Sequence, residues 1–277
     1  MDKLIKSFEK PDNITELAID SHAHLCDEYN ENKIANYMER DGLYAIVNMT
    51  GSIESALKAS EISNKFNNIY YMFGLHPYNV DEYNDEYVSL ITELTERDKG
   101  RLVGLGEIGL DYHVEEPSRD AQIDVFVRQL ELAHKLGLPV SLHIRDAHAD
   151  AITILKENKH LLTNGGIIHC FSGGIEEVQE YLALGFHISI SGAVTFKKKS
   201  ERISILEEAI KVVPRDKLLI ETDSPFLCPH PYRGHVNEPK YVLLTAMHIA
   251  DLLQVDVNVL IRETRENVIN LLKLKKD

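Results

Sequence analysis

The chain has 277 residues, of which 44% are hydrophobic and 27% charged, and no apolar run approaches the roughly 20 residues that a membrane-spanning helix needs. A formal net charge of −14 argues against a protein that coats duplex DNA through a basic face, although an enzyme that grips a few nucleotides remains compatible with it. The N-terminus lacks the apolar core of a secretory signal, so we expect a cytoplasmic protein without a membrane partner. Cys26, Cys170 and Cys228 form no CxxC pair and are expected to be small buried residues.

Short apolar runs recur along the chain, and each interval between them is long enough for one helix. The runs are mostly continuous rather than alternating in polarity, which is typical of parallel strands covered on both faces. Ser118 and Gly137 bracket one predicted helix, and further helices are expected over 174–184 and 200–213. The apolar runs are residues 17–20, 44–48, 69–73, 102–106, 139–144, 166–170, 186–190 and 217–221.

These repeated units predict an α/β protein with a single-domain (β/α)₈ TIM barrel. An open, doubly wound sheet is the alternative, but the number of units and the placement of the polar residues favour closure. The barrel domain is expected to span residues 16–277, and residues 1–15 form an N-terminal extension to which the sequence assigns no function.

Side chains that bind metals gather directly after the predicted strands. His22 and His24 lie two residues apart in an extended segment, so both can point to the same side. One histidine in such a position is more often structural than a ligand, and the inference depends on the coincidence of several. In a barrel these strand ends form the active-site face. The other candidates are Glu107, His143, His169 and Asp223.

The mixture of imidazole and carboxylate groups suits divalent ions such as Mg²⁺, Mn²⁺ or Zn²⁺. Six ligands exceed what a single open catalytic site uses, because three protein ligands plus water are usual for zinc. We therefore expect two divalent metal ions, bridged by one carboxylate, and Glu107 is the candidate for the bridge.

Together these residues lie in segments by which the chain resembles the TatD-type deoxyribonuclease family, within the amidohydrolase-like metal-dependent hydrolases. The segments occur in order and cover nearly the whole chain after about its first fifteen residues. They are DSHAHL (20–25), GLHP (74–77), GEIGLDY (106–112), HIR (143–145), HCFSG (169–173), SGAVTFK (191–197), ETDSPFL (221–227) and RGHVNEP (233–239).

The resemblance implies a role for each matching residue. One metal would be held by His22, His24 and Asp223, and the second by His143 and His169, with Glu107 between them. Among the other matching residues, His76 would lie near the substrate phosphate, Arg145, Arg233 and Glu238 would contact the substrate, and the catalytic residues would be Asp223, Glu107 and His76.

One position departs from the family pattern, because Val236 stands where a second basic residue is common. That change would weaken the grip on a phosphate backbone. Lys197, Lys198 and Lys199 are candidate basic contacts, although a solvated loop is the simpler interpretation.

The implied activity is metal-dependent hydrolysis of DNA phosphodiester bonds, exonucleolytic on single-stranded or frayed ends, without an obligate protein partner. Asp223 would accept the proton of the attacking water, and His76 would donate to the phosphate or the leaving oxygen. Asp111 either orients a metal ligand or stabilises a turn. Two alternatives remain: a deacylase or amidohydrolase acting on a C–N or ester bond, and a metal-stabilised binding protein without turnover.

Overall fold

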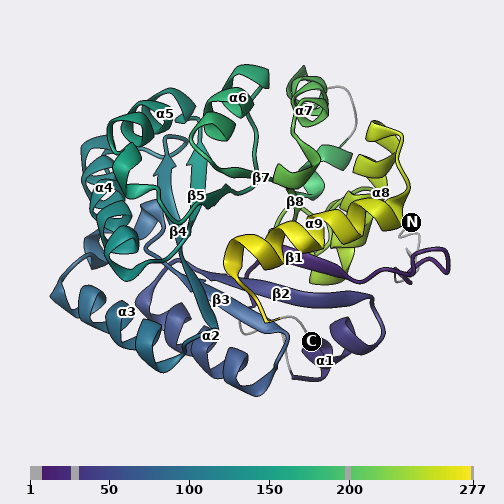
Figure 1. Ribbon diagram of the computed structural model, residues 1–277, viewed down its shortest axis with the longest axis horizontal. Helices are drawn as coiled ribbons and strands as arrows, with labels where there is room; N and C mark the ends of the chain where they lie inside the picture. The colour runs from purple at the N-terminus through teal and green to yellow at the C-terminus, as the bar shows by residue number, and fades with distance from the viewer. Residues whose placement is uncertain (1–7, 26–30, 197–200, 276–277) are drawn as a thin grey trace.

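A computed structural model describes residues 8–25, 31–196 and 201–275 of the chain. Its centre is an eight-stranded sheet in which neighbouring strands are parallel, from β1 and β2 through to β7 and β8, and follow one another in sequence order (Figure 1). Each strand overlaps one of the eight predicted apolar runs, although their bounds differ at most of them. They are β1 (Ala18–Ala23), β2 (Leu43–Thr50), β3 (Ile69–Phe73), β4 (Leu102–Asp111), β5 (Val140–Arg145), β6 (Gly166–Ile168), β7 (His187–Ile190) and β8 (Leu218–Ile220).

Helices connect the strands and surround them (Figure 1). The described α-helices are α1 (Glu31–Glu39), α2 (Ile53–Lys65), α3 (Asp85–Arg97), α4 (Arg119–Leu136), α5 (His148–Glu157), α6 (Ile175–Ala183), α7 (Glu201–Lys211), α8 (Val242–Leu253) and α9 (Val257–Leu272). Short 3₁₀ segments are η1 (Pro77–Glu82), η2 (Lys159–Leu161), η3 (Gly192–Thr195), η4 (Arg215–Lys217) and η5 (Pro239–Tyr241).

Helix α4 begins after Ser118 and ends at Gly137, the two residues that were predicted to bound it. The Ser118 side chain accepts a hydrogen bond from the Ala121 amide at the start of α4, and Gly137 ends that helix with φ +70°. A left-handed residue at this position lets the last turn satisfy its carbonyl groups, and glycine adopts it without a Cβ clash.

Backbone hydrogen bonds join the last strand segment to the first. The His24 amide donates to the Ser224 carbonyl at 2.7 Å, and the Asp223 amide donates to the His22 carbonyl at 2.9 Å. These bonds bring the two ends of the sheet together at its C-terminal edge, so the predicted (β/α)₈ barrel is confirmed and the open sheet is wrong.

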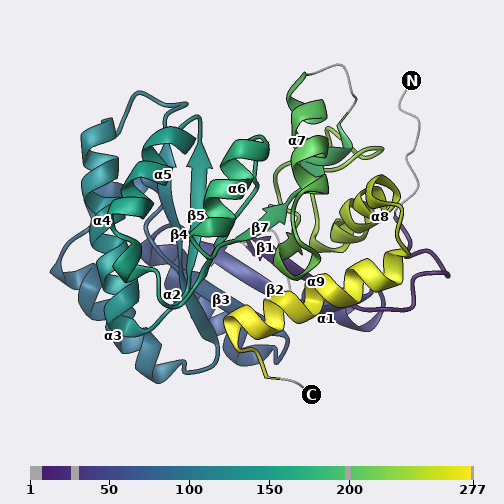
Figure 2. The ribbon, with the colours of Figure 1, turned by 45° about the horizontal axis from the view of Figure 1, so that its top comes forward.

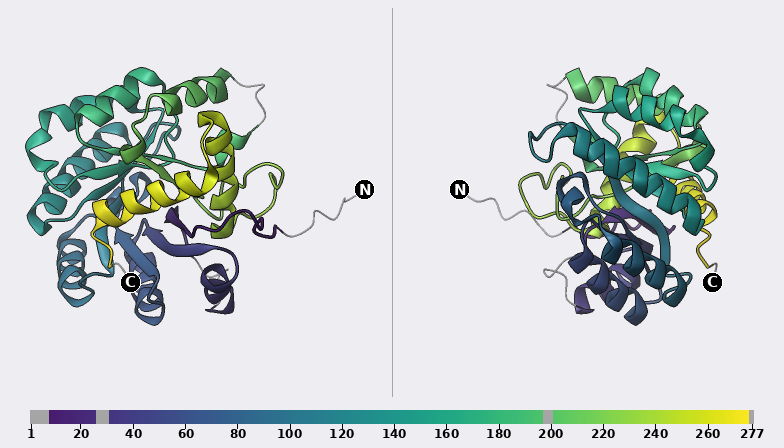
Figure 3. Two further views of the ribbon diagram at one scale, coloured as in Figure 1. Left: turned by 45° about the vertical axis from the view of Figure 1, so that its right-hand side comes forward. Right: turned by 90° about the vertical axis from the view of Figure 1, so that its left-hand side faces the viewer.

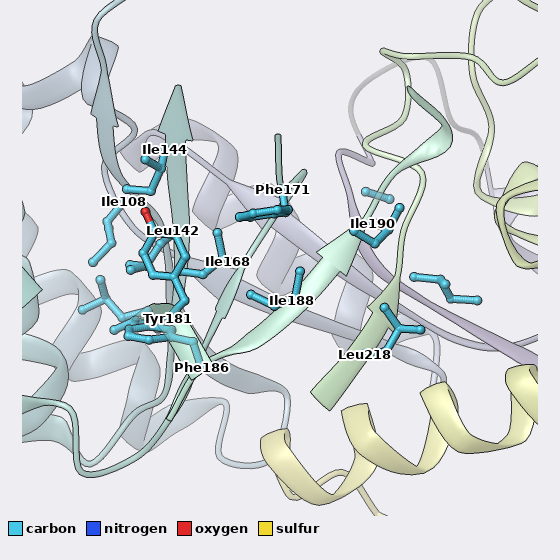
Figure 4. Packing of buried hydrophobic residues seen from close by; sticks show 14 of the residues in the cluster. Ile108, Leu142, Ile144, Ile168, Phe171, Tyr181, Phe186, Ile188, Ile190 and Leu218 are labelled. Atoms are coloured by element: carbon cyan, nitrogen blue, oxygen red, sulfur yellow. The ribbon is translucent and has the colours of Figure 1, made fainter. Parts of the chain in front are cut away.

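Two apolar layers stabilise the barrel. One lies between strands and helices, where Leu142, Ile168 and Ile188 pack with Tyr181 and Phe186 (Figure 4). The other gathers alternate strand residues, which point to the same side of a strand, with residues of α9. Its members are Ile19, Ala45, Val47, Met49, Tyr70, Met72, Val103, Ile167, Leu219, Val268, Ile269, Leu272 and Leu274.

Helix α9 covers the N-terminal end of the barrel (Figures 2 and 3). The Arg265 guanidinium donates to the Leu17 carbonyl just before β1, and the Asn267 amide donates to the Leu218 carbonyl at the start of β8. The opposite, C-terminal edge of the sheet is left to carry the polar side chains.

Within the described ranges no single helix is long and apolar enough to cross a membrane. The segment of η5 and α8, taken together with α9, has the required length and composition only as a pair that is bent by 113°.

Candidate metal centre

The first strand brings two imidazole rings to the C-terminal edge of the barrel. His22 and His24 place their Nε2 atoms 3.3 Å apart. Asp20 holds this segment against the chain after β8, because its Oδ1 accepts the Thr222 amide at 2.9 Å and its Oδ2 accepts the Thr222 hydroxyl. The buried Asp20 carboxylate, which was absent from the predicted site, therefore sets the position of both neighbouring histidines.

Asp223 joins these two rings from the segment that follows β8. Its Oδ1 lies 3.4 Å from His24 Nε2 and 3.7 Å from His22 Nε2. The residue has φ +56°, in the left-handed region that aspartate tolerates better than most residues. The hydrogen bond from its backbone N–H to the His22 carbonyl stabilises that conformation and directs the side chain toward the histidines.

Glu107, in the middle of β4, faces the two halves of the cluster with different oxygens. Its Oε2 lies 3.5 Å from His22 Nε2 and 3.7 Å from His24 Nε2. Its Oε1 lies 2.9 Å from His143 Nδ1 and 2.8 Å from His169 Nε2. One carboxylate therefore stands between two separate sets of nitrogen ligands, which is the place a bridging ligand would occupy.

The second pair of histidines is oriented by acidic residues outside the cluster. His143 Nε2 lies 3.0 Å from Asp111 Oδ2, and His169 Nδ1 lies 3.3 Å from Glu221 Oε1. A hydrogen bond to the outer ring nitrogen determines which tautomer presents its lone pair to the centre. Asp111 combines both predicted roles, since its Oδ1 also accepts the His113 amide in the following turn.

Glu221 is a site residue that the sequence interpretation missed. Its carboxylate is fully buried and also accepts hydrogen bonds from the Cys170 amide at 2.6 Å and the Ser189 hydroxyl at 2.5 Å. The available signal was its position, an acidic residue at the end of an apolar strand and two residues before Asp223.

The electrostatics of the cluster favour cation binding. Burial raises the pKa of the Glu107 carboxyl, but the surrounding histidines outweigh this effect and hold it well below its ordinary value. The pKa of Asp223 is also lowered, because its contact with His24 and the charge of His22 outweigh its burial. Both carboxylates are thus ionised at neutral pH, and imidazole with carboxylate is a donor set that fits divalent ions such as Zn²⁺ and Mn²⁺.

His76 lies beside this cluster with a defined tautomer. Its Nδ1 accepts the Tyr78 amide at 3.2 Å, which leaves the hydrogen on Nε2, and Nε2 lies 3.9 Å from Glu107 Oε1. Burial lowers the pKa of His76 to about 4. The ring is therefore neutral at pH 7 and turns an N–H donor toward the centre.

The predicted substrate contacts are less closely grouped. Arg145 and Arg233 are both exposed. Arg145 Nη1 lies 3.9 Å from Asp111 Oδ2, and the Arg233 guanidinium lies over the Phe196 ring, 3.8 Å from its centroid. Glu238 accepts a hydrogen bond from the Tyr37 hydroxyl at 3.1 Å. Lys197, Lys198 and Lys199 lie outside the described residues.

The structure thus brings together the six predicted ligands and His76. Among the residues that the structure describes, three groups of side chains have ligand atoms close enough to share an ion. They are His22 with His169 and Asp223, His22 with His24 and Glu107, and His76 with Glu107 and His143.

Comparisons with known proteins identify the family to which the chain is similar. A family model described as "TatD related DNase" matches residues 19–273. A Bacillus subtilis protein named "Uncharacterized metal-dependent hydrolase YabD" is 37% identical over 261 residues, which is 93% of this chain and 100% of that protein. An Erwinia amylovora protein named "3'-5' ssDNA/RNA exonuclease TatD" is 32% identical over 226 residues, covering 80% of this chain and 85% of the relative.

Solved structures show the same fold. The Escherichia coli YJJV protein, a TatD homolog, superposes with a TM-score of 0.83 at 24% identity, over 93% of this chain and 98% of that one. A TatD family hydrolase from Entamoeba histolytica gives a TM-score of 0.80 at 25% identity, over 93% and 98%.

Proposed function

The chain belongs to the TatD-related DNase family of metal-dependent hydrolases, and from this premise we propose that it shortens single-stranded or frayed DNA ends by hydrolysing phosphodiester bonds. The Erwinia amylovora relative, named as an exonuclease of single-stranded DNA and RNA, supports this substrate class. The predicted cytoplasmic location stays a prediction.

The observation that carries the proposal is the position of Glu107. Its two carboxylate oxygens contact different histidine pairs, so the chain offers two adjacent sites for divalent ions. We assign His22, His24 and Asp223 to one ion and His143 and His169 to the other. Divalent ions held there would supply Lewis-acid chemistry, because they lower the pKa of water and neutralise charge on phosphate oxygens.

Asp223 is positioned to receive the proton of the attacking water. Its Oδ1 faces His22 and His24, and its lowered pKa keeps the carboxylate ionised at neutral pH. General base catalysis of this kind contributes roughly 10²- to 10⁴-fold to the rate.

His76 would stabilise the substrate rather than transfer a proton. Its neutral ring has Nδ1 occupied by the Tyr78 amide, so Nε2–H can donate a hydrogen bond to a nonbridging phosphate oxygen. Arg145, Arg233 and Glu238 stay predicted substrate contacts, to be tested by substitution.

The test is hydrolysis of end-labelled single-stranded DNA by the purified protein. It is run after chelation and again with Mg²⁺, Mn²⁺ or Zn²⁺ restored, beside Glu107→Ala and Asp223→Ala. We expect stepwise shortening that requires metal and is lost in both variants.

Glu157→Ala is a matched control, because Glu157 is an exposed residue at the end of α5. It should retain wild-type hydrolysis. If the folded, metal-loaded wild-type protein shortens no DNA with any of the three ions, the proposal is overturned, and esters and amides become the substrates to test.

A further inference from the structure

An exposed aromatic ring lies at the edge of the candidate metal centre. Phe226 has 59% of its surface exposed, the largest fraction among the large hydrophobic side chains that the structure describes. Its ring centroid lies 5.9 Å from that of His24 in an edge-to-face arrangement. Its position beside a proposed metal ligand leaves the ring free to contact a substrate bound at the centre, and covering it would gain apolar burial energy.

The backbone of Phe226 is fixed on both sides. Its amide donates to the Asp223 carbonyl at 2.8 Å, and its carbonyl accepts the Asn237 side-chain amide at 2.6 Å. The ring is therefore presented by a held segment, whose position relative to Asp223 is set by a direct hydrogen bond. A preorganised ring loses little entropy on binding.

A cavity of about 380 Å³ also has His24 in its lining and lies between the ends of β1 and β2 and the start of α2. This volume lies at the lower end of the usual range for small-molecule sites, which suits one nucleoside rather than a longer segment. Its lining includes His24, Asn48, Thr50, Ser52, Glu54 and Lys58.

Asn48 contributes a side-chain amide to the lining of this cavity. The side chain is only 2% exposed, and its Oδ1 accepts the Leu25 amide at 2.8 Å. No residue in the described part of the chain accepts a hydrogen bond from its Nδ2. A buried amide donor that meets no acceptor among the described residues is available to a ligand or to water.

The same lining disfavours a second phosphate. The first turn of α2 is already engaged, because the Ile53 amide donates to Glu82 Oε2 and the Ser55 amide to Ser52 Oγ. The cavity lining carries one carboxylate, Glu54, and one ammonium, Lys58, so it has no net positive charge for an anion. A neutral, planar group with carbonyl oxygens fits this surface better.

We propose that Phe226 and the cavity beside His24 bind the nucleoside next to the scissile phosphate, with its base stacked on Phe226 and an oxygen accepting from Asn48. This inference rests on the proposed function, since it assumes a nucleic-acid substrate at the metal centre. Stacking on an aromatic ring is tolerant of base identity, because every base has a π face. The site would therefore favour nucleotide substrates without selecting a sequence.

The chain contains no tryptophan, so Phe226→Trp places a single fluorescent reporter at this position. We expect its emission to be quenched, with saturation, by a thymidine dinucleotide carrying a phosphorothioate linkage but not by dimethyl phosphate. Val212→Trp is the matched control, because Val212 is 43% exposed at the end of α7. Equal responses to both probes, or equal responses of both variants, would overturn the inference.

Kinetics give an independent test. Phe226→Ala should lower the ratio of kcat/KM for oligonucleotide to kcat/KM for methyl 4-nitrophenyl phosphate about tenfold, the size expected for one stacked base. Asn48→Asp, which keeps the acceptor for Leu25 and removes the donor, should lower the same ratio. Ratios equal to that of the wild-type protein in both variants would overturn the inference.

The two proposals fail in distinguishable ways. If the wild-type protein shortens DNA but the dinucleotide does not change the fluorescence of Phe226→Trp, the proposed function stands and the nucleoside site is wrong. If the wild-type protein hydrolyses methyl 4-nitrophenyl phosphate but no DNA, the proposed function is wrong, and an absent dinucleotide response then removes the nucleoside site as well.

Discussion

Glu221 Oε1 lies 3.3 Å from His169 Nδ1, and this buried contact orients the ring whose Nε2 reaches Glu107. Glu221 thus influences the metal centre through His169. The Cys170 amide donates to the same oxygen, so the carboxylate holds both the ring and the backbone of this segment.

Replacing Glu221 by Gln should weaken metal binding about 10- to 100-fold, the usual cost of losing a partner behind a histidine ligand. The neutral amide keeps the shape of the side chain but removes the charge that polarises His169. Titration calorimetry with Mn²⁺ measures the change, and Glu157→Gln serves as an exposed control. An affinity equal to that of the wild-type protein would contradict the assigned role.

Gly109 lets β4 approach His143 closely. A Cβ at this position would lie 2.1 Å from the His143 carbonyl oxygen, and the residue has φ +142°. Gly109→Ala should therefore cost at least about 3 kcal/mol of unfolding free energy and displace His143. Gly137→Ala is the control: it has φ +70° but nothing within 4 Å of the added Cβ, so it should cost about 1 kcal/mol. Urea unfolding compares the two, and equal costs would refute the argument.

Removal of metal should lower the thermal stability of the protein. The Nε2 atoms of His22 and His24 are 3.3 Å apart and face two carboxylates, an arrangement that a bound cation stabilises. At a metal concentration of about 100 Kd, binding contributes about 2.7 kcal/mol, which corresponds to roughly 5–10 °C in Tm. Calorimetry with and without chelator measures the shift. If metal raises the Tm of Asp223→Ala as much as that of the wild-type protein, the ions bind at a different site.

His187 gives a pH dependence that is separate from the metal centre. Burial, reinforced by the charge of Lys217, lowers the pKa of this imidazole to about 4 at the start of β7. In the unfolded chain it titrates near 6.5, so the unfolded state binds more protons as the pH falls from about 6.5 to 4. The stability contributed by the neutral ring is therefore complete above pH 6.5 and decreases through this window.

Between pH 7.5 and pH 5 this loss amounts to about 2 kcal/mol. His187→Gln should remove that part of the pH dependence, measured as the difference between urea unfolding free energies at the two pH values. The exposed His160, replaced in the same way, should leave the difference as in the wild-type protein. If His187→Gln loses as much unfolding free energy between pH 7.5 and pH 5 as the wild-type protein does, another group causes the effect.

Local patterns were sufficient for the fold. The apolar run at 69–73 became β3, and Ser118 and Gly137 bounded α4, because strand burial and helix capping depend on neighbouring residues. Closure followed from the number of units, and polar residues after the strands predicted one shared face, since parallel strands place all their C-terminal ends together.

The details of the centre depended on contacts between distant segments. Glu107 contacts one histidine pair with each of its two carboxylate oxygens. This arrangement depends on how β1, β4, β5 and β6 are aligned with one another, and no single segment of the sequence contains that information. Residues 52 positions apart meet in the contact of Glu221 with His169. The hydrogen bond between Glu238 and Tyr37 joins residues that lie 201 positions apart in the chain. The sequence alone thus determined which residues reach the active-site edge, whereas tertiary packing decided which atoms face one another, because side-chain direction is set by neighbours brought together only on folding.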